Sequence, residues 1–194
     1  MVVCIACKKM SPHGLTCREC RDEMALIGVV SAGLYQSEHV RRGVHWLKFK
    51  GVRAVAPTLA GLLLDQLDMI APRPWLISRA VLAPIPLHVR RQRQRGFNQA
   101  ELIAKALGQQ SGISYLDLLK RQRATWTQTK LDADRRKENL AGAFVRASDL
   151  PAKTKIVLLV DDVTTTGSTL NEAAKVIRED YPDVKAWGVT VARG

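Results

Sequence analysis

Apolar residues recur along this chain with two periodicities, one typical of strands and one typical of helices. Short apolar runs predict strands over residues 28–35, 81–86, 114–119, 155–160 and 186–192. Helical spacing predicts helices over residues 39–50, 52–68, 98–107 and 168–180, with 132–140 as a further candidate. Strands that alternate with helices predict an α/β fold, with a parallel sheet and right-handed crossovers.

Glycine, proline and arginine mark the predicted breaks between these elements. Gly51 ends the first helix, and Gly108 is a plausible C-cap for the helix that begins at Asn98. The stretch 72–74, Pro-Arg-Pro, is predicted to be a linker, and residues 87–97 form a polar, arginine-rich loop.

The 194 residues suit one domain with a small appendage. The division falls after residue 22: a cysteine unit spans residues 1–22 and the main domain spans residues 23–194. The chain has 46% hydrophobic residues, enough for a substantial core. No apolar run approaches the roughly 20 residues that cross a bilayer, and the start is unlike a signal peptide. These features predict a cytoplasmic protein without membrane insertion.

All four cysteines lie in the first twenty residues. They form two Cys-x-x-Cys pairs, Cys4 with Cys7 and Cys17 with Cys20, in a polar segment too poor in apolar residues to fold without a cross-link. In a reducing compartment this spacing predicts a tetrahedral structural zinc site. A thioredoxin-like redox motif is the main rival, but it would require a βαβ context. His13 could replace a cysteine and is interpreted as a bystander.

The formal net charge is +12 at pH 7, with a pI of about 10.0. Such a charge favours polyanionic partners, either nucleic acid or phosphorylated small molecules. The alternative is that the basic balance only aids solubility.

The strand at 155–160 leads into two acids and a hydroxyl-rich turn before a helix. The acids are Asp161 and Asp162, and the turn comprises Val163, Thr164, Thr165, Thr166, Gly167, Ser168 and Thr169. Backbone N–H groups and hydroxyls at such a junction suit a phosphate, and glycine permits close approach. The two carboxylates suit ribose hydroxyls or Mg²⁺. The alternative is that the acids merely end a strand and Ser168 caps a helix, but the combination favours a ligand.

Four arginines in six positions precede the helix that begins at Asn98. They are Arg90, Arg91, Arg93 and Arg95, followed by Gly96, Phe97, Asn98 and Gln99. Their mutual repulsion would be relieved by an anion, for which pyrophosphate is the natural candidate. A solvated basic turn is a credible alternative, especially for Arg90 and Arg91, and contact with a nucleic-acid backbone is a third reading.

Two segments carry a resemblance to known families. Residues 157–169 resemble the signature by which type I phosphoribosyltransferases bind 5-phosphoribosyl-1-pyrophosphate (PRPP). The stretches Pro84-Ile-Pro-Leu-His88 and Arg95-Gly-Phe-Asn-Gln99 resemble the ComF family (ComFC), phosphoribosyltransferase-like proteins tied to natural competence and DNA uptake. The paired cysteines, Leu47-Lys-Phe-Lys-Gly51 and residues 123–144 agree, so the resemblance covers essentially the whole chain.

The resemblance implies a type I phosphoribosyltransferase-like parallel sheet flanked by helices, with an N-terminal four-cysteine zinc unit. Asp161 and Asp162 would hold the ribose 2- and 3-hydroxyls, directly or through Mg²⁺, and residues 164–169 would wrap the 5-phosphate. Arg95, Gly96, Phe97 and Asn98 would form the pyrophosphate loop. Residues 125–144 would be a mobile loop that closes over substrate and excludes water, with Gln128, Arg135 and Asn139 as its site residues. Lys48 could reach the site, although a solvated lysine is the plainer interpretation.

Two functions from different classes remain open. The first is a Mg²⁺-dependent phosphoribosyltransferase, in which an acceptor that the sequence does not name displaces pyrophosphate from PRPP. The second is a DNA-handling component of the transformation machinery, with single-stranded DNA, a competence helicase or other DNA-uptake proteins as partners and PRPP as a regulator or unused. The low aromatic content of 5% leaves few stacking platforms for single strands.

Overall fold

The computed structural model describes residues 3–123 and 140–194. The predicted site residues Gln128, Arg135 and Asn139 lie outside these ranges, as does nearly all of the predicted helix 132–140.

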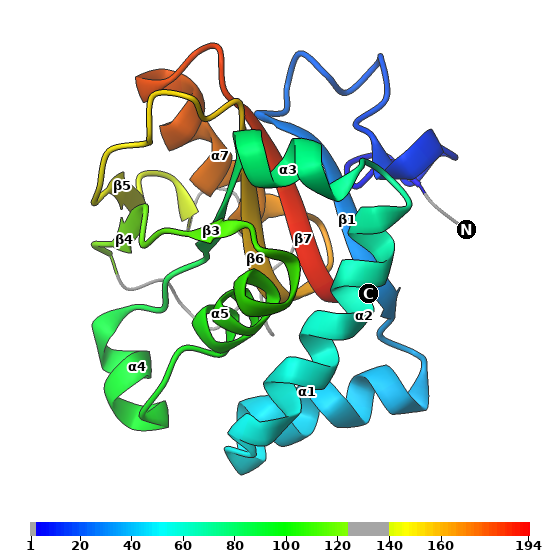
Figure 1. Cartoon of the computed structure of the whole chain (residues 1–194), viewed down its shortest axis with the longest axis vertical. Helices are drawn as coiled ribbons and strands as arrows, with labels where there is room; N and C mark the ends of the chain where they lie inside the picture. The colour runs from blue at the N-terminus through cyan, green and yellow to red at the C-terminus, as the bar shows by residue number, and fades with distance from the viewer. Residues whose placement is uncertain (1–2, 124–139) are drawn as a thin grey trace.

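A five-stranded sheet forms the centre of the molecule, in the order β1-β7-β6-β2-β3 (Figure 1). Its strands are β1 (Leu26–Leu34), β2 (Ala80–Pro84), β3 (Ser114–Tyr115), β6 (Ile156–Thr164) and β7 (Lys185–Arg193). Every neighbouring pair in this sheet is parallel. The strands' carboxyl ends therefore share one edge, where ligands bind in open α/β folds.

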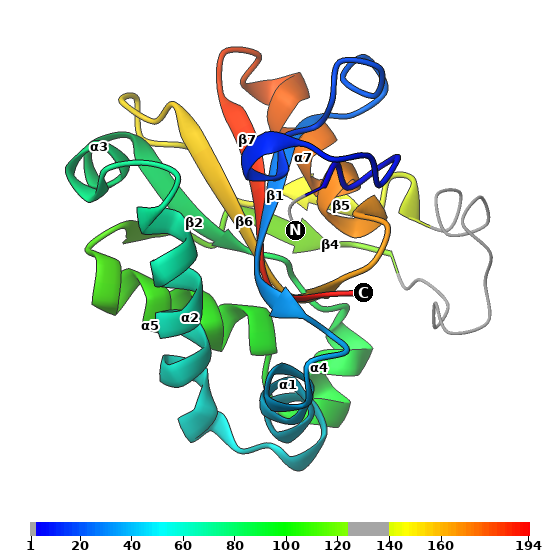
Figure 2. The ribbon, with the colours of Figure 1, turned by 90° about the vertical axis from the view of Figure 1, so that its right-hand side faces the viewer.

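Helices cover both faces of the sheet (Figures 1 and 2). They are α1 (Glu38–Lys50), α2 (Ala56–Asp68), α3 (Arg73–Arg79), α4 (Val89–Arg95), α5 (Gln99–Ser111) and α7 (Ser168–Asp180), with short 3₁₀ turns η1 (Pro12–Gly14) and η2 (Arg53–Val55). Along β6 the side chains alternate: Leu158 and Val160 pack with α1, α2 and α5, whereas Val157 and Leu159 pack with α7. These two apolar layers confirm the predicted α/β class, a parallel sheet flanked by helices.

Several predicted boundaries were wrong. The stretch 72–74 is not a linker, because α3 begins at Arg73 and proline is tolerated in a first helical turn. The arginine-rich segment is not a plain loop, since it contains α4. Helix α5 runs past Gly108 and ends before Gly112, which has the left-handed φ of +79° that a C-cap needs.

The predicted strand 114–119 was also wrong, because the chain leaves the main sheet after β3. It then forms β4 (Leu119–Arg121), which pairs antiparallel with β5 (Phe144–Arg146) in a separate two-stranded ribbon. Gly51, in contrast, ends α1 as predicted, with a φ of +67°.

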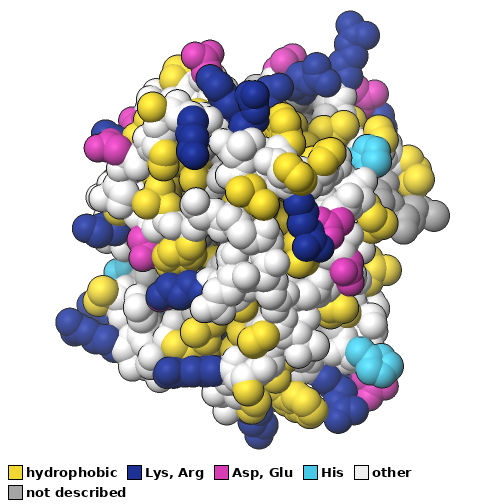
Figure 3. All heavy atoms as spheres, viewed as in Figure 1, with side chains coloured by type: hydrophobic (Ala, Val, Ile, Leu, Met, Phe, Trp, Pro, Cys, Tyr) yellow, Lys and Arg dark blue, Asp and Glu magenta, His cyan; other side chains and the backbone are white. Residues whose placement is uncertain are grey.

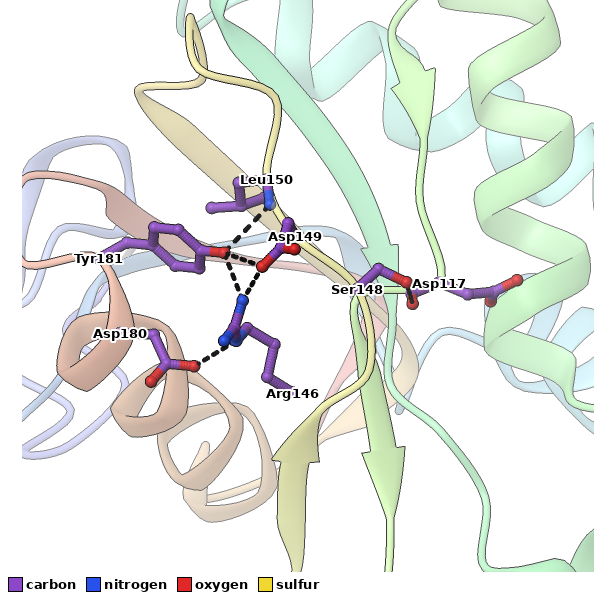
Figure 4. Close-up of polar contacts among 7 residues, drawn as sticks. All are labelled: Asp117, Arg146, Ser148, Asp149, Leu150, Asp180 and Tyr181. Atoms are coloured by element: carbon purple, nitrogen blue, oxygen red, sulfur yellow. Dashed lines mark hydrogen bonds and ion pairs between the residues drawn. The ribbon is translucent and has the colours of Figure 1, made fainter.

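The ribbon is fixed to the end of α7 by a polar network centred on Arg146 (Figure 4). The Arg146 guanidinium pairs with Asp149, lies 2.7 Å from an Asp180 oxygen and donates to the Tyr181 hydroxyl at 3.0 Å. The Leu150 N–H donates to the same hydroxyl at 3.2 Å. The ribbon therefore holds a fixed position beside the sheet.

The cysteine unit, here residues 3–22, packs on the sheet beside β1 (Figure 2). The Thr16 N–H donates to the Ile27 carbonyl at 2.8 Å, and Leu15 forms an antiparallel bridge with Gly28. Ile5 is fully buried in the same apolar layer as α7. The predicted boundary after residue 22 stays a prediction.

Within the described part of the chain, no single helix combines the length and apolar character needed to cross a bilayer. The segments Arg53–Asp68 and Arg73–Arg79 meet that criterion only when joined across a bend of 104°.

Candidate phosphate site and metal centre

The two predicted acids lie inside a strand rather than after it. Strand β6 ends at Thr164, four residues later than predicted, so Asp161 and Asp162 lie within the strand near its carboxyl end. Because side chains alternate along a strand, Asp162 points to the layer of α1 and α5, and Asp161 points to the layer of α7. The strand thus presents one acid on each face of the sheet, near its carboxyl edge.

Asp162 is a buried carboxylate held by two side chains from neighbouring helices. Its Oδ2 lies 2.8 Å from Lys48 Nζ, and its Oδ1 accepts a long bond of 3.4 Å from Gln99 Nε2. Burial opposes ionisation, but the neighbouring charge of Lys48 lowers the pKa of Asp162. Among the described residues, Oδ2 has no well-aligned hydrogen-bond donor despite the ion pair, so the atom retains capacity for a ligand.

The pKa of Asp161 shifts in the opposite direction to that of Asp162. Burial, and then the adjacent charge of Asp162, raise the pKa of Asp161 well above its usual range. Its Oδ1 accepts a hydrogen bond of 2.8 Å from the Asp162 backbone N–H. Two neighbouring carboxyls with opposed pKa shifts favour a cation or hydroxyl donors at this point.

A tight loop connects β6 to α7. This Thr–Gly loop, residues 164–169, lines a cavity of about 30 Å³ together with Asp161, Val163 and Leu170. Gly167 has a φ of +74°, and the Thr166 and Ser168 hydroxyls are 2.8 Å apart. The loop precedes the first turn of α7, and the backbone N–H groups at the start of a helix favour an anion.

Basic side chains lie on the other side of the acids. Lys48, Arg91, Arg95 and Arg121 share with Gln99, Asp161, Asp162 and Thr169 a cavity of about 140 Å³. Arg95 donates to the Gln99 Oε1 at 2.7 Å. Burial, and then the neighbouring charge of Arg91, lower the pKa of Arg121, which an anion between them would reverse.

The predicted pyrophosphate loop is divided by the structure. Arg95 lines the cavity, whereas Phe97 packs under the Arg53 guanidinium, 5.1 Å from its ring centre. Asn98 is buried, where its Oδ1 caps α5 and its Nδ2 donates to the Ile85 carbonyl at 3.0 Å. Gly96 supplies the left-handed cap of α4. These three residues shape the backbone that presents Arg95.

Three side chains of the cavity were missed or undervalued by sequence reasoning. Lys48 was interpreted as solvated, Gln99 was quoted only as part of a motif, and Arg121 was not singled out. Lys48 is brought there by the packing of α1, and Arg121 by the separate ribbon of β4 and β5. No periodicity within the sequence marks either placement.

The four cysteines converge as predicted. Their Sγ atoms all lie within 4.8 Å of one another, and those of Cys7 and Cys17 are 3.6 Å apart. A tetrahedral zinc ion with Zn–S bonds of about 2.3 Å separates its sulfurs by about 3.8 Å, so the set fits zinc. Burial would raise the pKa of Cys4, but hydrogen bonds from the backbone of Cys17, Cys7 and Ala6 lower it to about 6, which favours a metal-binding thiolate.

A larger cavity, of about 520 Å³, runs along β1 and α2. Its lining is mostly the apolar and small side chains of β1, with His13 and Arg193 as the ionisable groups. It lacks the paired acids and hydroxyls found at the carboxyl edge, so its chemistry suits a sugar phosphate less well.

Comparison with known proteins gives the family. Competence protein F from Haemophilus influenzae is 35% identical over 177 residues, which cover 88% of this chain and 73% of that protein. The chain belongs to the ComF family. DNA utilization protein YhgH from Salmonella typhi is 38% identical over 146 residues, covering 74% of this chain and 63% of that protein.

Competence protein ComFC from Streptococcus pneumoniae is 29% identical over 143 residues, which cover 73% of this chain and 59% of that protein. This chain therefore spans less than two thirds of the YhgH and ComFC proteins that it matches. No family model matches it. Membership in the ComF family confirms the resemblance read from the sequence and supports a role connected with competence.

Proposed function

We propose that this protein binds PRPP, with Mg²⁺, at the carboxyl edge of its sheet and acts as a phosphoribosyltransferase of the ComF family. One observation carries the proposal: Asp161 lines both the small cavity of the hydroxyl-rich loop and the larger cavity of the arginines, where the buried Asp162 pairs with Lys48. A ligand with a sugar between two phosphate groups matches this order of donors and acceptors.

The contacts follow from the chemistry of each part. Asp161 and Asp162 would accept hydrogen bonds from the ribose hydroxyls, and their carboxylates are the residues that would hold Mg²⁺, which would neutralise charge on the pyrophosphate. The 5-phosphate is bound by backbone N–H groups and hydroxyls of residues 164–169. Arg91, Arg95 and Arg121 face the pyrophosphate, for which guanidinium groups are well suited.

The proposed reaction exchanges one bond at the anomeric carbon. The C–O bond to pyrophosphate breaks, pyrophosphate leaves with the electron pair of that bond, and an acceptor nucleophile forms the new bond and loses its proton to solvent or a base. The described residues contribute positioning and charge stabilisation. The segment expected to close over the substrate, with Gln128, Arg135 and Asn139, lies outside the described residues.

Handling of DNA is a second candidate function, in which PRPP would be regulatory or unused. The names of the relatives concern competence and DNA utilization. Lys and Arg side chains spread over the face seen in Figure 3. On α1, Trp46 is 44% exposed with the Arg42 guanidinium 5.3 Å from its ring, and Phe49 is 63% exposed. These aromatic and basic groups suit single-stranded DNA, with a competence helicase or other cytoplasmic uptake proteins as further partners.

Calorimetric titration with PRPP and Mg²⁺ tests the first function. Loss of both carboxylates in Asp161→Asn/Asp162→Asn should weaken binding by at least about 100-fold, because two charged hydrogen-bond acceptors are removed. Asp65→Asn removes a negative charge from the exposed side of α2 and serves as the matched control. Unchanged affinity in the double variant would refute the site.

The salt dependence of DNA binding separates the two functions. A steep loss of affinity with salt that PRPP does not alter would place DNA on a separate, backbone-directed surface. Release of pyrophosphate from PRPP with any acceptor favours the enzyme.

A further inference from the structure

The cysteine unit and the Thr–Gly loop are in direct contact, although they are about as distant in the sequence as the chain allows. Lys8 Nζ donates to the Thr165 carbonyl at 2.6 Å. Ile5, which lies between the first two cysteines, packs so closely on Gly167 that an added Cβ there would come within 2.6 Å of its side chain. A loop and a metal-binding segment that share such contacts cannot move independently.

The end of β7 fixes the cysteine unit to the same loop. The Arg193 guanidinium is buried and donates to the Val3 carbonyl at 2.8 Å and to the Cys4 carbonyl at 3.2 Å. Its neighbour Gly194 donates through its backbone N–H to the Thr164 carbonyl at 2.9 Å. The first cysteine and the first loop residue are therefore attached to adjacent residues, Arg193 at the end of β7 and Gly194 just after it.

The contact with Lys8 also orients a backbone donor. In a planar trans peptide the carbonyl and the following N–H point in opposite directions. Holding the Thr165 carbonyl toward Lys8 therefore turns the Thr166 N–H away from the cysteine unit, and Thr166 lines the small cavity of the loop. Lys8 itself has a left-handed φ of +64°, which a non-glycine residue adopts at a cost, and it follows Cys7 directly. Metal bound by the cysteines would hold that backbone conformation in place.

We propose that the four-cysteine unit supports the phosphate site from behind the Thr–Gly loop, that Lys8 is the positioning residue between them, and that binding of a phosphorylated ligand depends on the metal. The contacts of Lys8, Ile5 and Arg193 support a coupling between the metal and the loop. The effect of this coupling on ligand affinity rests on the proposed function. The cysteine unit would then support the loop of the ligand site as well as cross-link its own segment.

Hydrogen exchange tests the coupling without any ligand. In the zinc-loaded protein, Lys8→Ala should increase amide exchange in the peptide that contains residues 164–169, while zinc content stays near one per chain. Lys9→Ala is the matched control, because Lys9 pairs with Glu19 at 2.5 Å within the cysteine unit and does not contact the loop. Removal of zinc by a chelator should increase exchange in the same peptide, and added zinc should restore protection.

Titration of the same proteins with Mg²⁺ and PRPP tests the consequence. Lys8→Ala should bind about tenfold more weakly than wild type, the factor expected for one hydrogen bond from a charged group, and Lys9→Ala should bind normally. If amide exchange in the peptide with residues 164–169 changes neither in Lys8→Ala nor on removal of zinc, the proposal is overturned, whatever the affinity for PRPP. If amide exchange in that peptide does change in these two ways but the wild-type protein does not bind PRPP, the proposed function is refuted and the coupling between metal and loop stands.

Discussion

The ion pair between Lys48 and Asp162 supports the most specific energetic prediction. Replacing Lys48 by Met keeps the length and apolar stem of the side chain and removes its charge. Asp162 then remains as a buried carboxylate whose side chain is 5% exposed, held by a long bond of 3.4 Å from Gln99 and by its contact with the Asp161 carboxyl. We therefore expect Lys48→Met to destabilise the free protein at neutral pH.

The magnitude follows from burial. Removing one partner of a fully buried pair costs about 3–5 kcal/mol. The Lys48 side chain is 27% exposed, and Asp162 can take up a proton, so the cost should be smaller, about 2 kcal/mol. For a domain of this size that lowers the melting temperature by roughly 4–8 °C.

The lowered pKa of Asp162 determines how the stabilisation by the ion pair changes with pH. The folded pKa of Asp162 lies below its unfolded value because of Lys48, so the pair stabilises the protein above the unfolded pKa, about 3.9. That contribution is lost as the pH falls through the lower, folded pKa. The difference in unfolding free energy between wild type and Lys48→Met should be full at pH 7 and should close below about pH 4.

Urea unfolding of four proteins measures the pair: wild type, Lys48→Met, Asp162→Asn and the double variant. The double variant should be destabilised by at least about 1 kcal/mol less than the sum of the single variants. Lys50→Met, on the exposed side of the same helix, controls for loss of charge. A stability of Lys48→Met within about 0.5 kcal/mol of wild type, unchanged with pH, would refute this reasoning.

Three further changes test other parts of the account. Asp161→Asn should raise the melting temperature at pH 7. The pKa of Asp161 is raised in the folded protein, so its ionisation reduces stability as the pH rises from about 3.9 toward the folded pKa. A gain in melting temperature that persists below about pH 3 would contradict this cause. Cys17→Ser should lower zinc content and reduce the free energy of unfolding by more than about 2 kcal/mol, and unchanged zinc and melting would argue against a metal site. Arg146→Ala should lower the midpoint of chemical denaturation slightly through loss of the contacts in Figure 4, whereas a denaturation curve identical to wild type would show that they add nothing.

The pattern of the sequence was enough to predict the core of the fold. The apolar runs at 155–160 and 186–192 became β6 and β7, because a strand buried on both faces leaves a continuous signature. The acids, the Thr–Gly loop and the cysteine pairs were also found, since each combines several chemically distinctive residues within a short segment. Short sequence patterns were therefore sufficient to predict the elements whose residues are neighbours in the chain.

Long-range packing decided what sequence reasoning missed. Gly108 and Gly112 are equally plausible caps by composition, but at Gly108 a Cβ would come within 3.1 Å of the Ile113 carbonyl, so that glycine serves close packing instead. The approach of Lys48 to Asp162, and of Lys8 to Thr165, joins residues more than a hundred positions apart. Such contacts follow from how α1 and the cysteine unit pack on the sheet.

A crystal structure of the zinc-loaded protein with Mg²⁺ and PRPP would show directly whether a sugar phosphate occupies the carboxyl edge beside Asp161 and Asp162. We expect a ribose whose hydroxyls contact the two acids and a 5-phosphate against residues 164–169. Ligand bound only elsewhere, for example in the cavity along β1, or an edge that stays free at saturating PRPP, would contradict it.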